Sequence, residues 1–358
     1  MHQAQFYRYI MSCFCLFFVL NSYALDVTFV NPGYSDSRSQ DNSTGNFWYK
    51  VAKLMHNAAD DLDINLNVKY ANRNHILMKD LIREAIKEKP DYLILVDEKS
   101  VSGDFLTKVN TQNIPIFFLL NPPSPNKLAV LKKHGLNIIG SISPDNQNVG
   151  RMLAQDLFEE HVSHSDDPAH MLALLGDYST PASIERTKGL MDYLSRSQVN
   201  LIAKDVANWS ENESYIKTIA FLHLAPEINI IWCANDAIAF GVKRALKKLN
   251  KESQVKVGGI NWDSTPKTLQ PLNVSYGGHV LLGAYALITL YDHSKNSSVW
   301  PIPHHTYSIF TRLSNHNKPL ISQINKADLA EIDFKKFSRM SHNWQEFTVE
   351  NLLKELKK

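Results

Sequence analysis

Short apolar runs alternate with amphipathic segments along the chain from about residue 25 onward. The apolar runs are typical of buried strands, and the segments between them carry apolar residues at the spacing of a helix face. In the first half of the chain this pattern predicts helices over 48–62, 77–85 and 101–110, and strands over 26–31, 66–70, 92–96, 114–120 and 136–140.

The same alternation starts again after about residue 144. Alternating strands and helices with short turns form parallel sheets covered by helices, so the chain predicts two consecutive doubly wound α/β lobes. The length of 358 residues fits two hydrophobic cores better than one. In this second series we expect helices over 147–160, 180–196, 211–223 and 235–250, and strands over 171–175, 199–206, 228–233 and 255–260.

The first 24 residues have a composition of their own. Arg8 is their only charged residue, Tyr9–Leu20 is almost wholly apolar, and Ser22 and Ala24 place small residues before a cleavage point. This order predicts a secretory signal peptide over residues 1–24 and a mature protein in the periplasm. The apolar stretch is shorter than the roughly 20 residues of a membrane-spanning helix, and a retained membrane anchor is the alternative.

Charge and cysteine content narrow the function classes. The 38 basic and 36 acidic residues give a formal net charge of +2, without a block of like charge that would indicate nucleic-acid or membrane-surface binding. Cys13 and Cys15 leave with the predicted signal peptide, so Cys233 is expected as a single buried thiol. We therefore expect an exported monomer whose stability comes from its hydrophobic cores.

Polar and aromatic residues gather where the predicted strands end. In doubly wound sheets, ligands bind beyond the carboxyl ends of the strands. Aromatic faces cover the C–H patches of a sugar, and amides, carboxylates and guanidinium groups pair with its hydroxyls. Any single Asn or Asp in such a place is as well explained as a helix cap. The candidate ligand-binding residues are Phe47, Trp48, Asp97, Asn121, Asp145, Arg186, Trp209, Asn235, Asn261 and His279.

Over residues 25–312 the chain resembles the type I periplasmic binding proteins, the ribose- and galactose-binding family. The segments that carry the resemblance are 27–33, 46–48, 143–151, 185–189, 233–241 and 257–263. The resemblance implies that Phe47 and Trp48 stack on a sugar, that Arg186 donates to two adjacent oxygens, and that Asn235 faces the ligand. It also implies a permease partner that recognises the closed protein.

The resemblance further implies three interlobe strands near 141–144, 277–280 and 303–306, with His279 at this hinge. The expected N-terminal lobe is 25–142 with 279–304, the C-terminal lobe is 143–278 with 305–330, and 331–358 is an extension. Asn261 replaces the family's usual Asp unless Asp263 takes that place, and His279 stands where ribose-binding relatives carry Gln. Both departures leave the identity of the ligand open.

Three other functions compete with sugar transport. The same fold presents ligands to membrane sensors such as chemoreceptors, kinases or cyclases, and furanosyl signals are among these ligands. An amino-acid binder would use Arg186 for the carboxylate and Asp97 for the amine. An enzyme is disfavoured, because neither a phosphate-binding glycine loop nor a Gly-x-Ser-x-Gly elbow occurs. We expect no cofactor and no metal, since His161 and His164 lack neighbouring ligands.

Overall fold

The structure, a computed structural model, describes residues 24–36, 43–296 and 304–356. The predicted signal peptide therefore lies outside the described residues, except for Ala24. Within the described part of the chain, no helix has the length and apolar character needed to cross a membrane.

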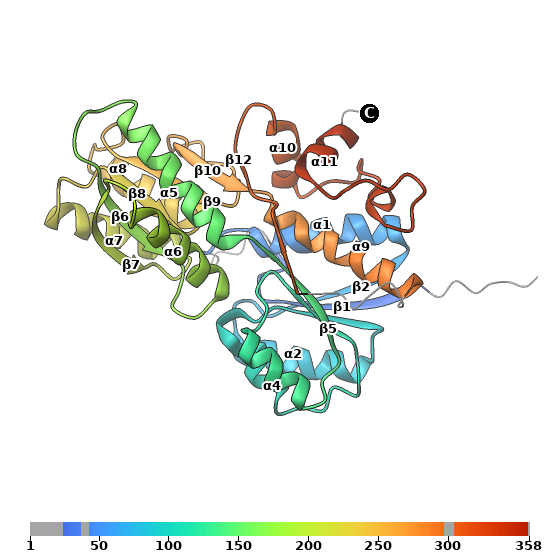
Figure 1. Cartoon of the computed structure of the whole chain (residues 1–358). Helices are drawn as coiled ribbons and strands as arrows, with labels where there is room; N and C mark the ends of the chain where they lie inside the picture. Colours follow the sequence, from blue (N-terminus) through green and yellow to red (C-terminus); the bar gives the residue numbers. More distant parts are fainter. Residues whose placement is uncertain (1–23, 37–42, 297–303, 357–358) are drawn as a thin grey trace, which may run out of the picture.

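Two six-stranded sheets form the two lobes (Figure 1). The first has the order β11-β5-β4-β3-β1-β2 and the second β12-β10-β9-β8-β6-β7. All strand pairs are parallel except β10 with β12, so the expected pair of doubly wound lobes is confirmed. The first-sheet strands are β1 (Leu25–Asn31), β2 (Ile64–Tyr70), β3 (Tyr92–Leu95), β4 (Ile116–Leu119), β5 (Ile138–Pro144) and β11 (His304–Tyr307); the second-sheet strands are β6 (His170–Leu175), β7 (Asn200–Val206), β8 (Ile230–Cys233), β9 (Lys256–Ile260), β10 (Val274–Gly277) and β12 (Thr311–Arg312).

Helices cover both faces of each sheet. Successive residues of β3 serve different cores: Ile94 packs with α1 and α9, whereas Leu93 and Leu95 pack with α2 and α3. This division explains the uninterrupted apolar runs in the sequence, because a strand buried on both faces has no solvent side. The helices are α1 (Phe47–Leu62), α2 (His75–Glu88), α3 (Val101–Leu106), α4 (Pro125–Lys133) and α9 (Leu282–Lys295) in the first lobe, and α5 (Asn146–Val162), α6 (Pro181–Leu194), α7 (Glu211–Leu224) and α8 (Asp236–Lys248) in the second.

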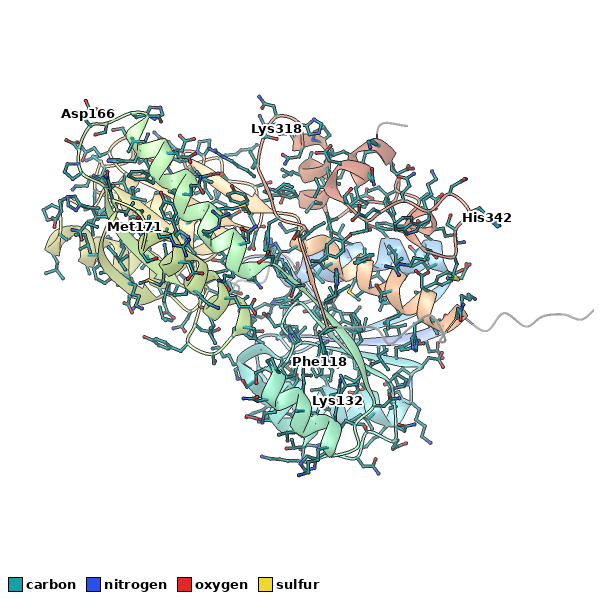
Figure 2. The ribbon with its side chains drawn as sticks, in the orientation of Figure 1. Phe118, Lys132, Asp166, Met171, Lys318 and His342 are labelled. Atoms are coloured by element: carbon teal, nitrogen blue, oxygen red, sulfur yellow. The ribbon has the colours of Figure 1, made fainter. Side chains whose placement is uncertain are left out.

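The sequence pattern missed helix α4, which is short and only weakly amphipathic. Ser124 caps it and Pro125 begins it, as at many helix starts. Leu128 and Leu131 are its only buried residues, so an apolar periodicity hardly develops. Figure 2 labels Phe118 and Lys132 of this lobe; Phe118 of β4 is buried and Lys132 of α4 is exposed.

The chain passes between the lobes after β5, after β10 and between β11 and β12 (Figure 1). The third passage was expected near 303–306. However, residues 304–307 form β11 and pair with β5 of the first sheet, so the passage comes after Tyr307. The chain then pairs briefly with β10 as β12 before it leaves the second lobe again.

The C-terminal segment belongs to the first lobe. Residues 305–330 were expected in the second lobe, yet α10 (Lys318–Lys326) buries Leu320, Ile321 and Ile324 in the core that contains α1 and α9. The 3₁₀ helix η4 (Phe334–Phe337) and helix α11 (Val349–Glu355) contribute to that core as well. The apolar face of α10 needs a partner, and α1 supplies it (Figure 1).

Candidate ligand-binding site

A cavity lies between the lobes, next to the carboxyl ends of both sheets. It contains about 560 Å³ of space outside protein atoms, part of it open to solvent. Eight of the ten candidate residues from the sequence line it: Phe47, Trp48, Asn121, Arg186, Trp209, Asn235, Asn261 and His279.

Asp97 and Asp145 do not line this cavity, and both serve the backbone instead. Asp97 Oδ1 accepts the Gly103 N–H at 2.7 Å, and Asp145 caps α5 by accepting the Asn148 N–H at 3.0 Å. Both contacts fit the alternative explanation from the sequence, in which an Asp after a strand caps backbone N–H groups and does not bind a ligand. Burial raises the pKa of Asp97 to about 6, against the opposing effect of the Gly103 hydrogen bond.

Several lining residues were not among the candidates. Arg73 and Glu98 form an ion pair at 2.5 Å on the first-lobe side, and the Glu98 side chain is only 8% exposed. Both follow strand ends, where ligands bind in such sheets. The sequence offered Asp97 and Glu98 together at the end of β3, and Asp97 was the residue selected; the end of β2 was not considered. The remaining additional lining residues are Thr44, Leu120, Pro144, Asn146, Thr180 and Ala182.

Trp48 is held in place by the end of β1. Asn31 donates from Nδ2 to the Trp48 carbonyl at 2.9 Å and accepts the Gly33 N–H at 2.7 Å. A Cβ at Gly33 would lie 2.3 Å from the Trp48 Cβ, so only glycine permits this approach. Phe47 contacts Trp48 edge to face, with ring centroids 5.2 Å apart. The sequence Asn31-Pro32-Gly33 therefore positions the aromatic pair.

Trp209 is fixed on the second-lobe side by a similar arrangement. Its indole N–H donates to Asp177 Oδ2 at 2.7 Å, and a Cβ at Gly176 would come within 2.2 Å of its ring. Asp177 also accepts from Thr180 and Ser179. Burial alone would raise the pKa of Asp177, but these hydrogen bonds outweigh it and lower the pKa. The carboxylate thus acts as a rigid support for the indole.

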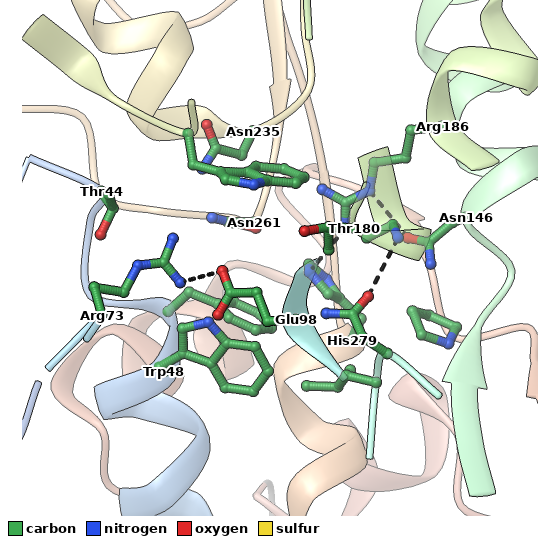
Figure 3. A pocket seen from close by; sticks show the side chains of 16 residues that line it. Thr44, Trp48, Arg73, Glu98, Asn146, Thr180, Arg186, Asn235, Asn261 and His279 are labelled. Atoms are coloured by element: carbon green, nitrogen blue, oxygen red, sulfur yellow. Dashed lines mark hydrogen bonds and ion pairs between the residues drawn. The ribbon is translucent and has the colours of Figure 1, made fainter. Parts of the chain in front are cut away.

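Arg186 on α6 is buried, and its partners are uncharged. It donates to Asn146 Oδ1 at 3.0 Å and to His279 Nε2 at 3.2 Å (Figure 3). It also donates to the Ala234 carbonyl at 2.7 Å. Among the described residues, no carboxylate lies within ion-pair distance of this guanidinium. Burial lowers the pKa of Arg186 to about 10, so the side chain stays protonated at neutral pH. Two of its five N–H groups have no part in these three bonds.

His279 stabilises Arg186 from the second interlobe passage. A guanidinium only donates, so Nε2 of the imidazole must accept and the proton lies on Nδ1. Burial, followed by the nearby Arg186 and Lys50, holds the pKa of His279 well below its usual range. The ring is stacked on Phe47 and tilted against Phe310, with centroids 4.7 Å from each. His279 therefore connects the first-lobe aromatic pair with Arg186.

The three candidate amides divide their groups between structure and cavity. Asn235 caps α8 by accepting the Ile238 N–H at 2.9 Å, and Asn261 donates to Asp263 Oδ2 at 3.1 Å. Asn121 accepts the Ala182 N–H at 3.2 Å, and this bond joins the two lobes. Of the two residues that the sequence offered as alternatives, Asn261 lines the cavity and Asp263 does not.

The lobes touch each other around the cavity. Besides the Asn121–Ala182 bond, the Glu211 N–H donates to the Ser43 carbonyl at 2.9 Å, and the Ser210 hydroxyl contacts the Ser43 hydroxyl at 3.2 Å. These bonds cross from one lobe to the other, so the structure represents a closed arrangement. A cavity with indole rings on both sides and neutral amides between them can enclose a flat, hydroxyl-rich molecule.

Known proteins support this view of the molecule. Residues 39–273 match the periplasmic binding protein domain family, which is more than half of the chain, and the protein belongs to this family. The type I fold is also that of a periplasmic sugar-binding protein from Pseudomonas fluorescens, whose structure is 26% identical with a TM-score of 0.77 over 92% of this chain and 99% of that chain.

Two further proteins are similar to this chain, one in sequence and one in fold. The D-allose-binding periplasmic protein of Escherichia coli is 25% identical over 191 residues, covering 52% of this chain and 60% of the relative. The Caulobacter myo-inositol-binding protein shares the fold at 16% identity, with a TM-score of 0.68 over 86% of this chain and 99% of that chain. The chain thus spans 60% of the length of this curated relative.

Proposed function

We propose that the protein captures a small sugar or cyclic polyol in the interlobe cavity and releases it to a membrane permease. The observation that carries the proposal is the placement of Trp48 and Trp209 on opposite lobes of one cavity that also contains Arg186 and neutral amides. Such walls bind the faces and hydroxyl edges of a sugar ring simultaneously.

The cavity fits a sugar better than an amino acid. An amino-acid ligand needs a carboxylate for its ammonium group. The one carboxylate among the described lining residues is Glu98, and Arg73 already pairs with it. Asp97, the residue considered for this role, is bonded to Gly103 outside the cavity. The cavity therefore has a cation for oxygen atoms and no unpaired anion for an amine.

Export and the permease partner form part of the proposal. The apolar segment before Ala24 has the order of a signal peptide. The relatives include a D-apiose import binding protein from Actinobacillus succinogenes, 24% identical over 180 residues. Closure over the ligand would provide the state that a membrane partner distinguishes from the empty protein.

Calorimetric titration of the mature protein tests the proposal directly. The panel comprises pentoses, hexoses, inositols and furanoses, with amino acids as the contrasting class. We expect saturable one-to-one binding of at least one sugar or inositol, and a smaller radius of gyration in X-ray scattering when that ligand is present. Binding of an amino acid in place of every sugar would contradict the proposal, as would catalytic turnover of the bound sugar.

A further inference from the structure

Lys50 of α1 lies at a second contact between the lobes, away from the Asn121 bond. Its ammonium group pairs with Asp263 Oδ1, just beyond β9 of the second lobe, and donates to Asn325 Oδ1 at 3.0 Å. Lys50 is 5% exposed, and the Asp263 side chain is 12% exposed. This ion pair is therefore largely shielded from solvent and salt, unlike most surface pairs.

The C-terminal segment closes the same contact from the other side. Asn325 of α10 donates to the Trp262 carbonyl at 2.9 Å while it accepts from Lys50. Trp262 has a left-handed φ of 61°, which is unfavourable for a bulky side chain, and its ring is buried in the first-lobe core. Contacts with the first lobe and with α10 must therefore hold the loop 261–263 in this conformation.

This loop leads directly to the ligand cavity. Asp263 Oδ2 accepts the Nδ2 of Asn261 at 3.1 Å, and Asn261 lines the cavity. The orientation of the Asn261 carboxamide thus depends on Asp263, and Asp263 is oriented in turn by Lys50 from the opposite lobe.

The second lobe by itself places two carboxylates together here. The Asp263 N–H donates to Asp236 Oδ2 at 2.9 Å, and Asp236 is fully buried with Ser275 as a further donor. Burial, followed by the charge of Asp263, raises the pKa of Asp236. Among the described residues, Lys50 is the cation that contacts this pair. Without Lys50, the two acids would face each other with no cation of the described chain in contact.

We propose that Lys50, Asp263 and Asn325 form an interlobe latch that positions Asn261 in the cavity and slows opening of the closed protein. The latch rests on the proposed function for its effect on ligand release, but its effect on closure does not require a ligand. Lys50 and Asn325 act here as positioning residues, because they reach the cavity only through Asp263 and Asn261.

Replacement of Lys50 by Met tests the latch while keeping the length of the side chain. We expect the ligand dissociation rate to rise about tenfold or more, with a nearly unchanged association rate, because loss of one partner of a buried ion pair acts mainly on dissociation. Stopped-flow measurements would use D-allose, D-ribose or myo-inositol, whichever the wild-type protein binds. Lys53→Met removes the same charge from an exposed position of the same helix and should leave both rates unchanged.

Two further variants separate a lost latch from a damaged fold. Asn325→Ala should raise the dissociation rate less than Lys50→Met does, with an unchanged circular dichroism spectrum. In the Lys50→Met background, Asp263→Asn should add little to the dissociation rate, since the two residues act as one pair. A Lys50→Met protein that folds and keeps the wild-type dissociation rate would overturn the proposal.

A ligand-free measurement distinguishes failure of the latch from failure of the sugar-binding proposal. Spin labels at Asp80→Cys on α2 and Lys188→Cys on α6, both exposed sites, report the distance between the lobes by pulsed electron resonance. We expect a short-distance population in the otherwise wild-type protein that is depleted by Lys50→Met. Identical distance distributions would exclude the latch even if sugar binding is established, and a depleted short population would support it even if no sugar binds.

Discussion

Arg186 and Lys50 are both buried cations near the boundary between the lobes, and they are stabilised in different ways. Arg186 bonds to Asn146, to the Ala234 carbonyl and to His279. Lys50 contacts Asp263 on the opposite lobe. The partners of Arg186 come from the second lobe and from the passage between the lobes, so its environment requires no contact across the closed cleft.

The different environments of the two cations suit them to different tasks, Arg186 to recognition of a ligand and Lys50 to closure of the lobes. A guanidinium held by neutral acceptors keeps its charge available for a ligand, and it is already oriented when the ligand arrives. An ammonium paired with a carboxylate has no such capacity, but the pair stabilises the arrangement in which the lobes meet. We therefore expect substitutions around Arg186 to change both the association and the dissociation rate of the ligand. Substitutions around Lys50 should change mainly the lifetime of the closed form.

The largest effect is expected from Arg186→Met. Hydrogen bonds to charged groups contribute about 1.5–3 kcal/mol each, so loss of the guanidinium should raise the dissociation constant roughly 100-fold or more. Both rate constants should change, in contrast to Lys50→Met. Calorimetry and stopped-flow kinetics would measure this, with Arg196→Met, exposed on the same lobe, as the control. An affinity within threefold of wild type would remove Arg186 from the site and end the comparison.

A smaller loss is expected when the second-lobe indole is replaced. Trp209→Ala removes the ring face and should weaken binding by about five- to thirtyfold, on the basis of roughly 1–2 kcal/mol for aromatic stacking and burial. Trp209→Phe keeps a ring but loses the bond to Asp177, and should weaken binding by only about threefold. Trp344→Ala replaces a half-exposed indole in the C-terminal segment and should have no effect on affinity. Equal losses for Ala and Phe would assign the role to the bond with Asp177.

The bond between His279 and Arg186 provides a third test. His279→Leu removes the acceptor and should raise the dissociation constant by about fivefold to tenfold, which is less than the full value of a bond to a charged group because this bond orients Arg186 and is not made to the ligand. Glutamine offers an oxygen acceptor, so His279→Gln should recover most of the affinity. Because the pKa of His279 is far below its usual range, wild-type affinity should be constant from pH 8 to pH 6. A loss of affinity on acidification over this window would show that the imidazole is protonated there.

Substitution of Asp97 is expected to have the smallest effect on ligand binding. It should change the free energy of unfolding instead. Its pKa is raised to about 6 in the folded protein, so between about pH 4 and pH 6 the folded state binds more protons than the unfolded state. This contribution to the free energy of unfolding therefore falls as the pH rises through that window. Asp97→Asn keeps an acceptor for Gly103 and should be more stable than wild type at pH 7.5, by roughly 1–3 kcal/mol.

Urea denaturation of both proteins at pH 4.5 and pH 7.5 measures this difference. The advantage of the asparagine variant should shrink toward pH 4.5, and sugar affinity should be unchanged in both. A variant that is less stable than wild type at pH 7.5 would show that the ionised carboxylate is favoured at this position.

Much of the site was accessible from the sequence, because in doubly wound sheets the strand ends converge on one edge. Phe47, Trp48, Asn235 and Asn261 were selected as residues near strand ends, and all four line the cavity. The same rule selected Asp97 and Asp145, which cap backbone groups instead. A sequence position does not distinguish a carboxylate that faces a ligand from one that faces a neighbouring N–H group, since both lie at the same strand end.

The sequence alone determined the number of lobes, the alternation of strands and helices, and the edge at which the cavity forms, because these depend on periodicity and chain order. Only the tertiary structure assigned the C-terminal segment to the first lobe and joined Lys50, Asp263 and Asn325, which are 275 residues apart at the extremes. Such contacts depend on side chains brought together by folding. The spacing of apolar residues along a helix predicts that one face will be buried, but it does not predict which surface will cover that face.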